Sequence, residues 1–385
     1  MSDALERAEG LISYYDEEVR RLLPPGAEIF DAHVHCGRDI DGHVADYDGL
    51  VSFLRRSGTS RAFCFCLDEP DRHPAFRAAN DRTLAAAERS GGMLVPFLRL
   101  DLTEGPLDEA TRCLDRGARG IKLHPRSQAF VLNDGRLDPI FALAAERGVP
   151  ILIHGGRGLP PIADHLRRLV DRHPASELII AHGGIADLGG LAGAFAEHPG
   201  VFFDTSVWSA VDILDLYCRV SPEQLLYASD FPYGQQPQAL LLDLRIARLA
   251  GYSKDELEGV LGGNAARIAD GRARPAPTPP KRATQTLVQP IQLSRIHTYL
   301  TLATPLIWTR QADVVGALGL AMNAAAERDG AANDVCDRIS ELLSCAQDVW
   351  RTLPEQEADS DRMFVSRSAF RLVHLADIEA LTTPT

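Results

Sequence analysis

Short apolar runs recur along the first two thirds of the chain, and segments with helical spacing of apolar residues separate them. A short apolar run is typical of a buried β-strand, whereas apolar positions three and four residues apart are typical of an amphipathic helix. The runs predict eight strands, at residues 29–35, 61–67, 93–100, 119–124, 149–154, 177–182, 201–205 and 225–230. Helices are expected at 3–23 and then near 46–57, 74–90, 106–117, 137–147, 160–172, 187–197, 208–219 and 236–250.

This alternation predicts an α/β fold, the (β/α)8 TIM barrel, because each parallel strand needs a crossover connection before the next one. A doubly wound open sheet is the alternative. The two differ in where polar residues gather. A barrel collects its chemistry at the C-terminal ends of many strands, and an open sheet uses one crevice.

Ionisable residues lie at the C-terminal ends of five of the eight predicted strands. His33 and His35 close the first strand, Lys122 and His124 the fourth, His154 the fifth, His182 the sixth and Asp230 the eighth. Side chains alternate along a strand, so His33 and His35 point to the same face. Because a buried, unpaired polar group costs several kcal/mol, these residues need a common partner, and a metal ion is the simplest one. Their distribution favours the barrel.

The composition changes after Ala269. Residues 271–290 hold Pro275, Pro277, Pro279, Pro280 and Pro290 and predict an extended linker. Apolar residues at helical spacing then predict three or four helices over 291–385, an all-α domain after a first domain at 1–270. Dimerisation through these helices, a cap over the barrel mouth and docking to a partner are the roles that the pattern leaves open.

Charge and composition narrow the classes of partner. The chain has 53 acidic against 40 basic residues, a formal net charge of -13, which argues against a nucleic-acid or anionic-membrane surface. No leader pattern and no membrane-length apolar window is seen, so we expect a cytoplasmic protein with a small-molecule substrate. The seven cysteines include no CxxC pair and are expected to be mostly buried, reduced thiols.

Six motifs, taken together and in this order, are specific. They are His33-x-His35, Gly120-Ile-Lys-Leu-His-Pro125, His154-Gly-Gly, His182-Gly-Gly, Ser229-Asp230-Phe-Pro232 and Gly263-Asn264-Ala265-Ala266. With them, the chain from about residue 28 to 270 resembles the amidohydrolase superfamily, in particular the amidohydrolase-2 group of metal-dependent hydrolases and decarboxylases.

The resemblance implies one divalent metal ion, zinc by preference, held by His33, His35, His154 and Asp230. It places His182 beside the water that the ion activates, as the preferred general base. In binuclear members a carboxylated lysine bridges two ions, and Lys122 occupies a similar place. In that case His154 and His182 would hold a second ion and Asp230 would be the base. The alternative is a lysine that pairs with Asp230 or with substrate.

Three arginines, Arg38, Arg126 and Arg157, each follow a motif strand within three residues and are expected at the barrel mouth. Guanidinium groups suit carboxylates, so the expected substrate is anionic, with Tyr233 and Trp208 packing on its apolar part. The alternative is that these arginines pair with loop carboxylates. His124 is predicted equally to bind substrate or to cap its strand, and His43 to be solvated or capping.

The expected activity is therefore metal-dependent hydrolysis of a C–N or C–O bond in a small, carboxylate-bearing molecule. A decarboxylase on the same barrel is the nearest alternative, and a catalytically silent scaffold with a helical binding module is a third.

Overall fold

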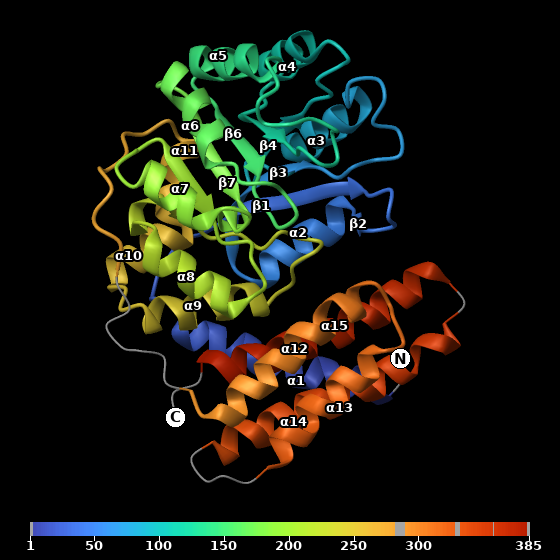
Figure 1. Cartoon of the computed structure of the whole chain (residues 1–385). Coiled ribbons are helices and arrows are strands. Elements are labelled where there is room, and N and C mark those ends of the chain that lie inside the picture. The colour runs from blue at the N-terminus through green and yellow to red at the C-terminus, as the bar shows by residue number, and fades with distance from the viewer. Residues whose placement is uncertain (1–2, 282–288, 328–331, 357, 383–385) are drawn as a thin grey trace.

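The structure is a computed structural model that describes residues 3–281, 289–327, 332–356 and 358–382 (Figure 1). Its centre is a curled nine-stranded sheet in the order β2-β1-β3-β4-β5-β6-β7-β8-β9, parallel throughout except for β1 with β2. The strands are β1 (Ile29–Arg38), β2 (Val44–Ala45), β3 (Thr59–Cys66), β4 (Leu94–Arg99), β5 (Gly120–Leu123), β6 (Pro150–His154), β7 (Glu177–Ala181), β8 (Val201–Asp204) and β9 (Leu225–Leu226).

The end of the sheet returns to its beginning. The amide of Ala32 in β1 donates to the carbonyl of Tyr227, 2.8 Å away, and the amide of Asp230 donates to the carbonyl of His33 at 2.9 Å. Val34 also pairs in parallel with Phe231. These bonds close the sheet, so the predicted TIM barrel is confirmed and the open-sheet alternative is wrong. The short hairpin strand β2 is the one strand that the pattern did not predict.

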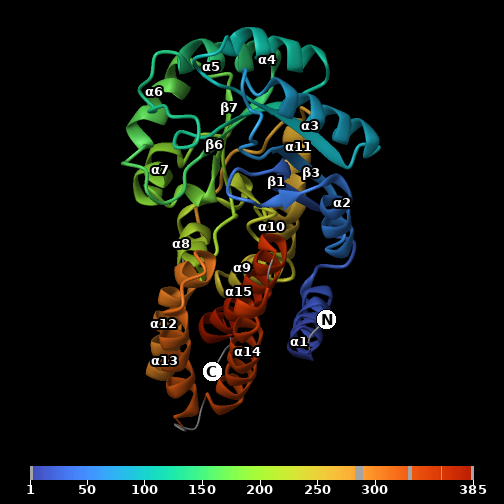
Figure 2. The same ribbon diagram turned by 90° about the vertical axis from the view of Figure 1, so that its right-hand side faces the viewer.

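The helices that accompany the barrel are α1 (Asp3–Leu22), α2 (Tyr47–Arg56), α3 (Arg77–Arg89), α4 (Pro106–Asp115), α5 (Leu137–Arg147), α6 (Ala163–Arg172), α7 (Leu188–Phe195), α8 (Ala210–Arg219), α9 (Gln238–Leu249), α10 (Lys254–Glu258) and α11 (Asn264–Ala269). Helices α2 to α8 lie between the strands and cover the barrel, α1 precedes β1 and packs with the later helices, and α9 to α11 follow β9 (Figures 1 and 2). No helix among the described residues has both the length and the apolar character needed to cross a membrane.

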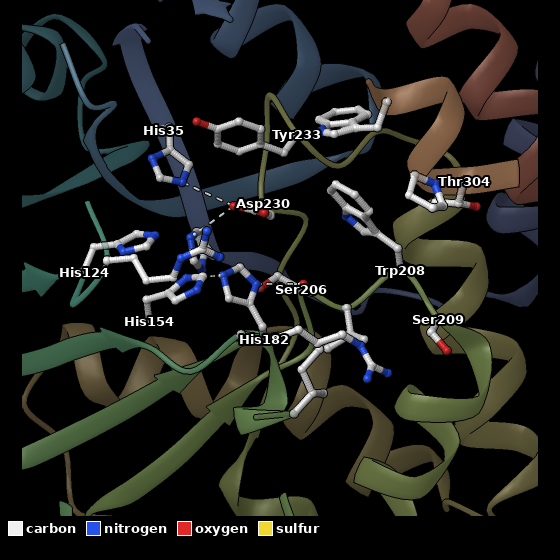
Figure 3. Close-up of a pocket in the computed structure, with 18 of the residues that line it drawn as sticks. His35, His124, His154, His182, Ser206, Trp208, Ser209, Asp230, Tyr233 and Thr304 are labelled. Carbon is white, nitrogen blue, oxygen red and sulfur yellow. Dashed lines mark hydrogen bonds and ion pairs between the residues drawn. The ribbon is translucent and has the colours of Figure 1, made fainter. Parts of the chain in front are cut away.

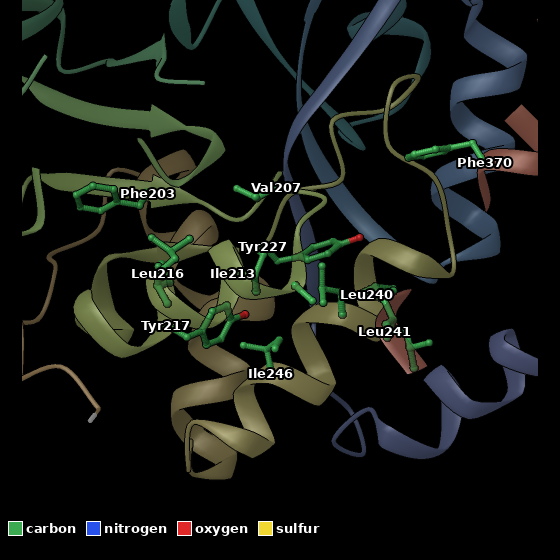
Figure 4. Packing of buried hydrophobic residues seen from close by; sticks show 14 of the residues in the cluster. Phe203, Val207, Ile213, Leu216, Tyr217, Tyr227, Leu240, Leu241, Ile246 and Phe370 are labelled. Atoms are coloured by element: carbon green, nitrogen blue, oxygen red, sulfur yellow. The ribbon is translucent and has the colours of Figure 1, made fainter. Parts of the chain in front are cut away.

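Two apolar layers form because strand side chains alternate between the faces of the sheet. Phe202 belongs to the inner cluster, with Phe30, Phe63 and Leu152. The neighbouring Phe203 belongs to the outer cluster, where the strands meet the helices; Figure 4 shows part of that cluster. The two layers hold the strand ends, and therefore the mouth of the barrel, in fixed positions.

A helical module follows the barrel, made of α12 (Ile291–Trp308), α13 (Val314–Ala326), α14 (Asn333–Arg351) and α15 (Asp359–Thr382). The predicted apolar stripe on α14 is buried from Val335 to Val349. Residues 282–288 of the predicted linker lie outside the described residues, and the separation into domains stays a prediction. Within the described residues none of the seven cysteines forms a disulfide, and six of them are buried, as expected.

The module docks against the barrel on α9 and on the segment after β9. Gln238 on α9 donates to the carbonyl of Arg371 on α15, 3.0 Å away, and the Arg371 guanidinium donates to the carbonyl of Gln236 at 2.8 Å. Helix α1 lies against α9, α14 and α15, so the N-terminal helix joins the module to the barrel. Buried apolar residues of barrel and module belong to one continuous cluster.

Candidate metal centre at the barrel mouth

His33 and His35 lie within β1, which runs three residues further than predicted, to Arg38, and Asp230 lies in the turn that follows β9. The alternation of β1 aims both rings at the same space, as predicted, and all three side chains are buried. Oδ1 of Asp230 is 3.2 Å from Nε2 of His33 and 3.2 Å from Nε2 of His35 (Figure 3). The three ligand atoms lie within 4.8 Å of one another, which is compatible with one shared ion.

A hydrogen bond on the side of the His33 ring away from Asp230 fixes the orientation of the ring. Its Nδ1 donates to Oδ2 of Asp204 at 2.7 Å, so Nε2 of the neutral ring presents a lone pair to the centre. Asp204 was not predicted as a site residue. It ends the apolar run of β8 (Val201–Asp204), and this is the same strand-end signal that identified the histidines.

His182 and His154 form a second pair beside this group. The Nδ1 of His182 donates to the carbonyl of Ser206 at 3.0 Å, so its Nε2 carries a lone pair, and this atom faces Nδ1 of His154 at 2.9 Å. His182 also joins His33 and Asp204 in a second group of possible ligands. Among the described residues, His154 falls in neither group and instead stacks on His124, with ring centroids 3.9 Å apart.

Lys122 is fully enclosed at the centre. Its Nζ lies 3.3 Å from Nε2 of His33. Burial lowers the pKa of Lys122 to about 7, although the charges of Asp204 and Asp230 oppose that shift. The structure therefore brings Lys122 to the predicted place, within reach of the metal-ligand group.

The protonation states suit a cation. Burial lowers the pKa values of His33, His35, His154 and His182, so their rings are neutral, as metal ligands must be. Burial also raises the pKa of Asp230 well above its usual value, because an isolated carboxylate is costly here. Lone pairs converge on a buried carboxylate, and a divalent ion would satisfy all of them. The residues present fit such an ion.

Backbone geometry supports the same centre. His182 and Asp230 both have left-handed backbones, with φ of 56° and 59°. Such conformations cost about 1 kcal/mol or more for residues other than glycine and are typical of functional sites. A Cβ on Gly156 would lie 2.9 Å from Nε2 of His154 and 3.2 Å from Cδ2 of His182, so this glycine keeps the space between the rings open.

Two of the three arginines predicted at the barrel mouth line the pocket, and the third does not. Arg126 and Arg157 line the pocket, but Arg38 is exposed at the end of β1 and does not line it. Arg157 is 69% exposed and pairs with Asp212, a carboxylate of α8 rather than of a loop. Arg99, which was not predicted, ends β4, lines the pocket and is only 3% exposed. Arg99 also follows an apolar run, so the sequence carries the same strand-end signal at this position.

Arg99 has few partners for a buried cation. Its Nη2 donates to Oγ of Ser127 at 2.7 Å and its Nη1 donates to the carbonyl of Cys66 at 3.4 Å. Its Nε has no hydrogen-bond partner, and Arg99 forms no ion pair with any described residue. His124 contributes a ring nitrogen that accepts from the amide of Ser127 at 3.3 Å, so it has a structural bond as well as a place in the pocket.

The candidate metal centre opens into a pocket of about 740 Å³. Tyr233 and Trp208 line it, as predicted, and residues of α12 and α15 complete it. The prediction for His43 was wrong, since this residue is 8% exposed and stacks on Trp308 of α12. The helical module thus stands over the barrel mouth, which was one of its expected roles.

Comparisons with known proteins show which family and which fold the chain shares. A family model described as amidohydrolase matches residues 31–268. Dihydroorotases from Pseudomonas putida and Pseudomonas fluorescens are 26% and 28% identical over 167 and 169 residues, which is 38% of this chain and 48% of each relative. The chain therefore spans about half the length of the curated relatives that it matches.

Two solved structures share the fold. IDCase from Metarhizium anisopliae, in its apo form, is 16% identical with a TM-score of 0.51, and the match covers 64% of this chain and 97% of that one. The 4-oxalomesaconate hydratase of Rhodopseudomonas palustris is 17% identical with a TM-score of 0.50, covering 63% and 95%. At this identity the likeness extends to the barrel fold alone.

Proposed function

Because the chain belongs to the amidohydrolase family, we propose that it is a metal-dependent hydrolase that cleaves a C–N or C–O bond of a small, carboxylate-bearing molecule. The observation that carries this proposal is the convergence of His33 and His35 on Asp230, with both ring nitrogens 3.2 Å from one carboxylate oxygen. A silent scaffold has no need for this convergence, since buried ionisable groups without partners destabilise a fold.

We assign His33, His35 and Asp230 as ligands of one zinc ion. His154, which contacts His182, is proposed as a further ligand on the resemblance of its motif alone. When bound, such an ion lowers the pKa of a water molecule and polarises the bond to be cleaved. Asp204 holds the His33 ring so that Nε2 faces the ion site. Lys122 serves as a pairing cation in this mononuclear form, and as a bridging carbamate only if two ions bind.

His182 is the proposed general base. Its Nδ1 proton is held by the carbonyl of Ser206, so Nε2 is the atom that accepts a proton. This nitrogen lies beside His154 and faces the centre of the pocket. After accepting the proton of the attacking water, His182 can return it to the leaving nitrogen or oxygen.

The carboxylate of the substrate is assigned to Arg99, and Arg126 also lines the pocket. A buried guanidinium without an ion pair gains most from an anionic partner, because it has already lost its hydration. The proposed partner is accordingly a small anionic molecule, and nucleic acid and membrane are not expected partners of an acidic chain.

The test is turnover in water labelled with oxygen-18. A panel of N-acyl amino acids and lactone acids is incubated with zinc-loaded protein, and products are followed by mass spectrometry. Hydrolysis places one labelled oxygen in the product, and chelation or Asp230→Asn should abolish it. Asp164→Asn, at an exposed position on α6, is the matched control and should retain activity.

Other outcomes assign other functions. Release of carbon dioxide without incorporation of label would contradict hydrolysis and identify the decarboxylase. If the zinc-loaded wild type transforms no member of the panel, the result would contradict the proposal and favour the scaffold.

A further inference from the structure

One wall of the pocket is built largely by the helical module, and its side chains are aromatic. Trp308 ends α12 and Phe370 lies in α15, with their ring centroids 5.3 Å apart. Trp208, which follows β8 in the barrel, lies 5.0 Å from Trp308 and 5.3 Å from Phe370. All three rings line the pocket that contains the metal centre.

Barrel residues continue this wall toward the metal ligands. Tyr233 lies 6.4 Å from Trp308 and 5.5 Å from His35, measured between ring centroids, so aromatic rings lead from the module to the metal ligands. His43 fills the space between them, stacked on Trp308 at 5.4 Å with planes 18° apart. Figure 3 shows Trp208, Tyr233 and Thr304 of α12 facing the same space.

Hydrogen bonds between module and barrel hold the wall in place. His374 of α15 donates to the carbonyl of Trp208 at 2.8 Å. Arg367 of α15 donates to Nδ1 of His43 at 2.7 Å, which keeps this ring neutral and against Trp308. Phe370 is only 2% exposed and belongs to the cluster shared by barrel and module. The rings therefore form a fixed surface.

The wall and the arginine are complementary in chemistry. Rings in offset or edge-to-face arrangements attract a further ring, and a rigid aromatic surface loses little entropy when it binds one. Arg99 supplies a buried positive charge in the same pocket. A volume of about 740 Å³ is more than a two-carbon acid would fill and suits a drug-sized ligand.

We propose that the helical module determines specificity by seating an aryl group against the aromatic wall formed by Trp308, Trp208 and Tyr233, with Phe370 packed behind the two tryptophans. The substrate class is then an aryl-substituted carboxylate, with its carboxylate on Arg99 and its reacting bond at the metal centre. The position of the reacting bond rests on the proposed function, whereas binding of the aryl group does not.

The experiment compares two probes that differ only in the ring, N-benzoylglycine and N-acetylglycine. Their affinities for the zinc-loaded full chain are measured by isothermal titration calorimetry, for wild type, Trp308→Ala, Phe370→Ala and Phe364→Ala. Phe364 also lies on α15 but is 49% exposed and does not line the pocket, so it is the matched control. Zinc content and the far-ultraviolet circular dichroism of each variant show whether it is folded.

Wild type and Phe364→Ala should bind the benzoyl probe at least about tenfold more tightly than the acetyl probe, since burial of a ring contributes at least this factor. Trp308→Ala should reduce the ratio of the benzoyl affinity to the acetyl affinity at least about fivefold, because it should weaken binding of the benzoyl probe alone. If Phe370→Ala or Trp308→Ala fails to fold, the milder Trp308→Leu gives the same comparison.

Equal binding of the two probes by wild type, failure of both to bind, or an unchanged ratio in folded Trp308 variants would overturn the proposal. The proposed function has a separate readout. A preserved aryl preference without hydrolysis would contradict the hydrolase and leave the specificity wall standing. Hydrolysis of the acetyl probe without an aryl preference would contradict the specificity wall and leave the hydrolase standing.

Discussion

Two regions of this molecule bury several charged groups, the barrel mouth and the junction of α1, α9 and α15. At the junction, Arg245 donates to Glu18 at 2.7 Å and to Glu379 at 2.8 Å, and Arg338 donates to Glu379 at 3.1 Å. Acidic and basic groups there face each other. At the mouth, ring nitrogens and a carboxylate face one another instead, and Arg99 is buried without an ion pair among the described residues.

The difference separates a structural role from a functional one. A buried network that completes its own ion pairs stabilises one arrangement of the chain, whereas a buried cluster whose lone pairs converge without a cation between them needs an external partner. Substitutions in the two regions should therefore affect different quantities. At the mouth they should change metal binding and catalysis, and at the junction they should change the free energy of unfolding.

The largest effect is expected for Asp230→Asn. Removing a metal ligand that also faces His33 and His35 should lower kcat/KM at least about a thousandfold and weaken zinc binding. The free energy of unfolding should change little in the metal-free protein, because burial already disfavours the charged form of this residue. Steady-state kinetics and denaturant unfolding measure the two effects. A large loss of stability with normal kcat/KM would contradict the comparison.

The opposite result is expected for Arg245→Met. Removing one member of a buried ion network takes away the cation that Glu18 and Glu379 share and should lower the free energy of unfolding by about 3–5 kcal/mol. Zinc content of the folded protein should not change. Arg351→Met, at a side chain that is 71% exposed and paired within its own helix, is the matched control and should cost less than about 1 kcal/mol.

A smaller effect is expected at the arginines of the mouth. Arg99→Met should raise KM for carboxylate substrates about tenfold to a hundredfold, because it removes charged hydrogen bonds in a buried position. Arg157→Ala should change KM by less, since Arg157 is mostly exposed and already paired with Asp212. If Arg99→Met and wild type have equal KM values, or if Arg157→Ala raises KM more, a residue other than Arg99 binds the carboxylate of the substrate.

The smallest effect is a pH dependence within the module. Burial alone would lower the pKa of His297, but the hydrogen bond and charge of Asp377 outweigh burial and raise it. The pair therefore stabilises the folded state below the unfolded pKa of about 6.5, and this contribution is lost as the pH rises through the raised folded value. The expected loss is less than about 1 kcal/mol.

The measurement for this pair is the unfolding free energy at pH 5.5 and pH 9, for wild type and His297→Gln. Wild type should lose more stability than the variant over this interval. Parallel changes in the two proteins would show that the pair does not titrate in this way.

The strand-end rule explains why much of the barrel and its centre could be predicted. His33, His35, Lys122, His182 and Asp230 each follow an apolar run, and in a closed barrel all such ends meet at one mouth. Arg99 and Asp204 follow the same rule, so the sequence contained their signal too. Arg38 satisfied the rule in sequence, but its side chain is exposed and lies outside the pocket.

No comparable rule exists for the helical module. Helical spacing correctly indicated which face of α14 is buried, but not which helices would dock on the barrel. Trp308 and Phe370 reach the mouth because α12 and α15 pack beside it, and that placement depends on contacts between segments far apart in the chain. The burial of His43 has the same cause, since Trp308 and Arg367 cover it.

The most direct test of the central claim is the metal content per chain of protein purified without chelator, measured for wild type, His35→Ala, Arg245→Met and His165→Ala. His165, half-buried on α6, is a matched histidine outside the pocket. We expect one zinc ion per chain in wild type, Arg245→Met and His165→Ala, and its loss in His35→Ala. Two ions per chain would contradict the mononuclear centre and make Lys122 a bridging ligand. No ion in wild type, even after zinc is added, would contradict the account as a whole.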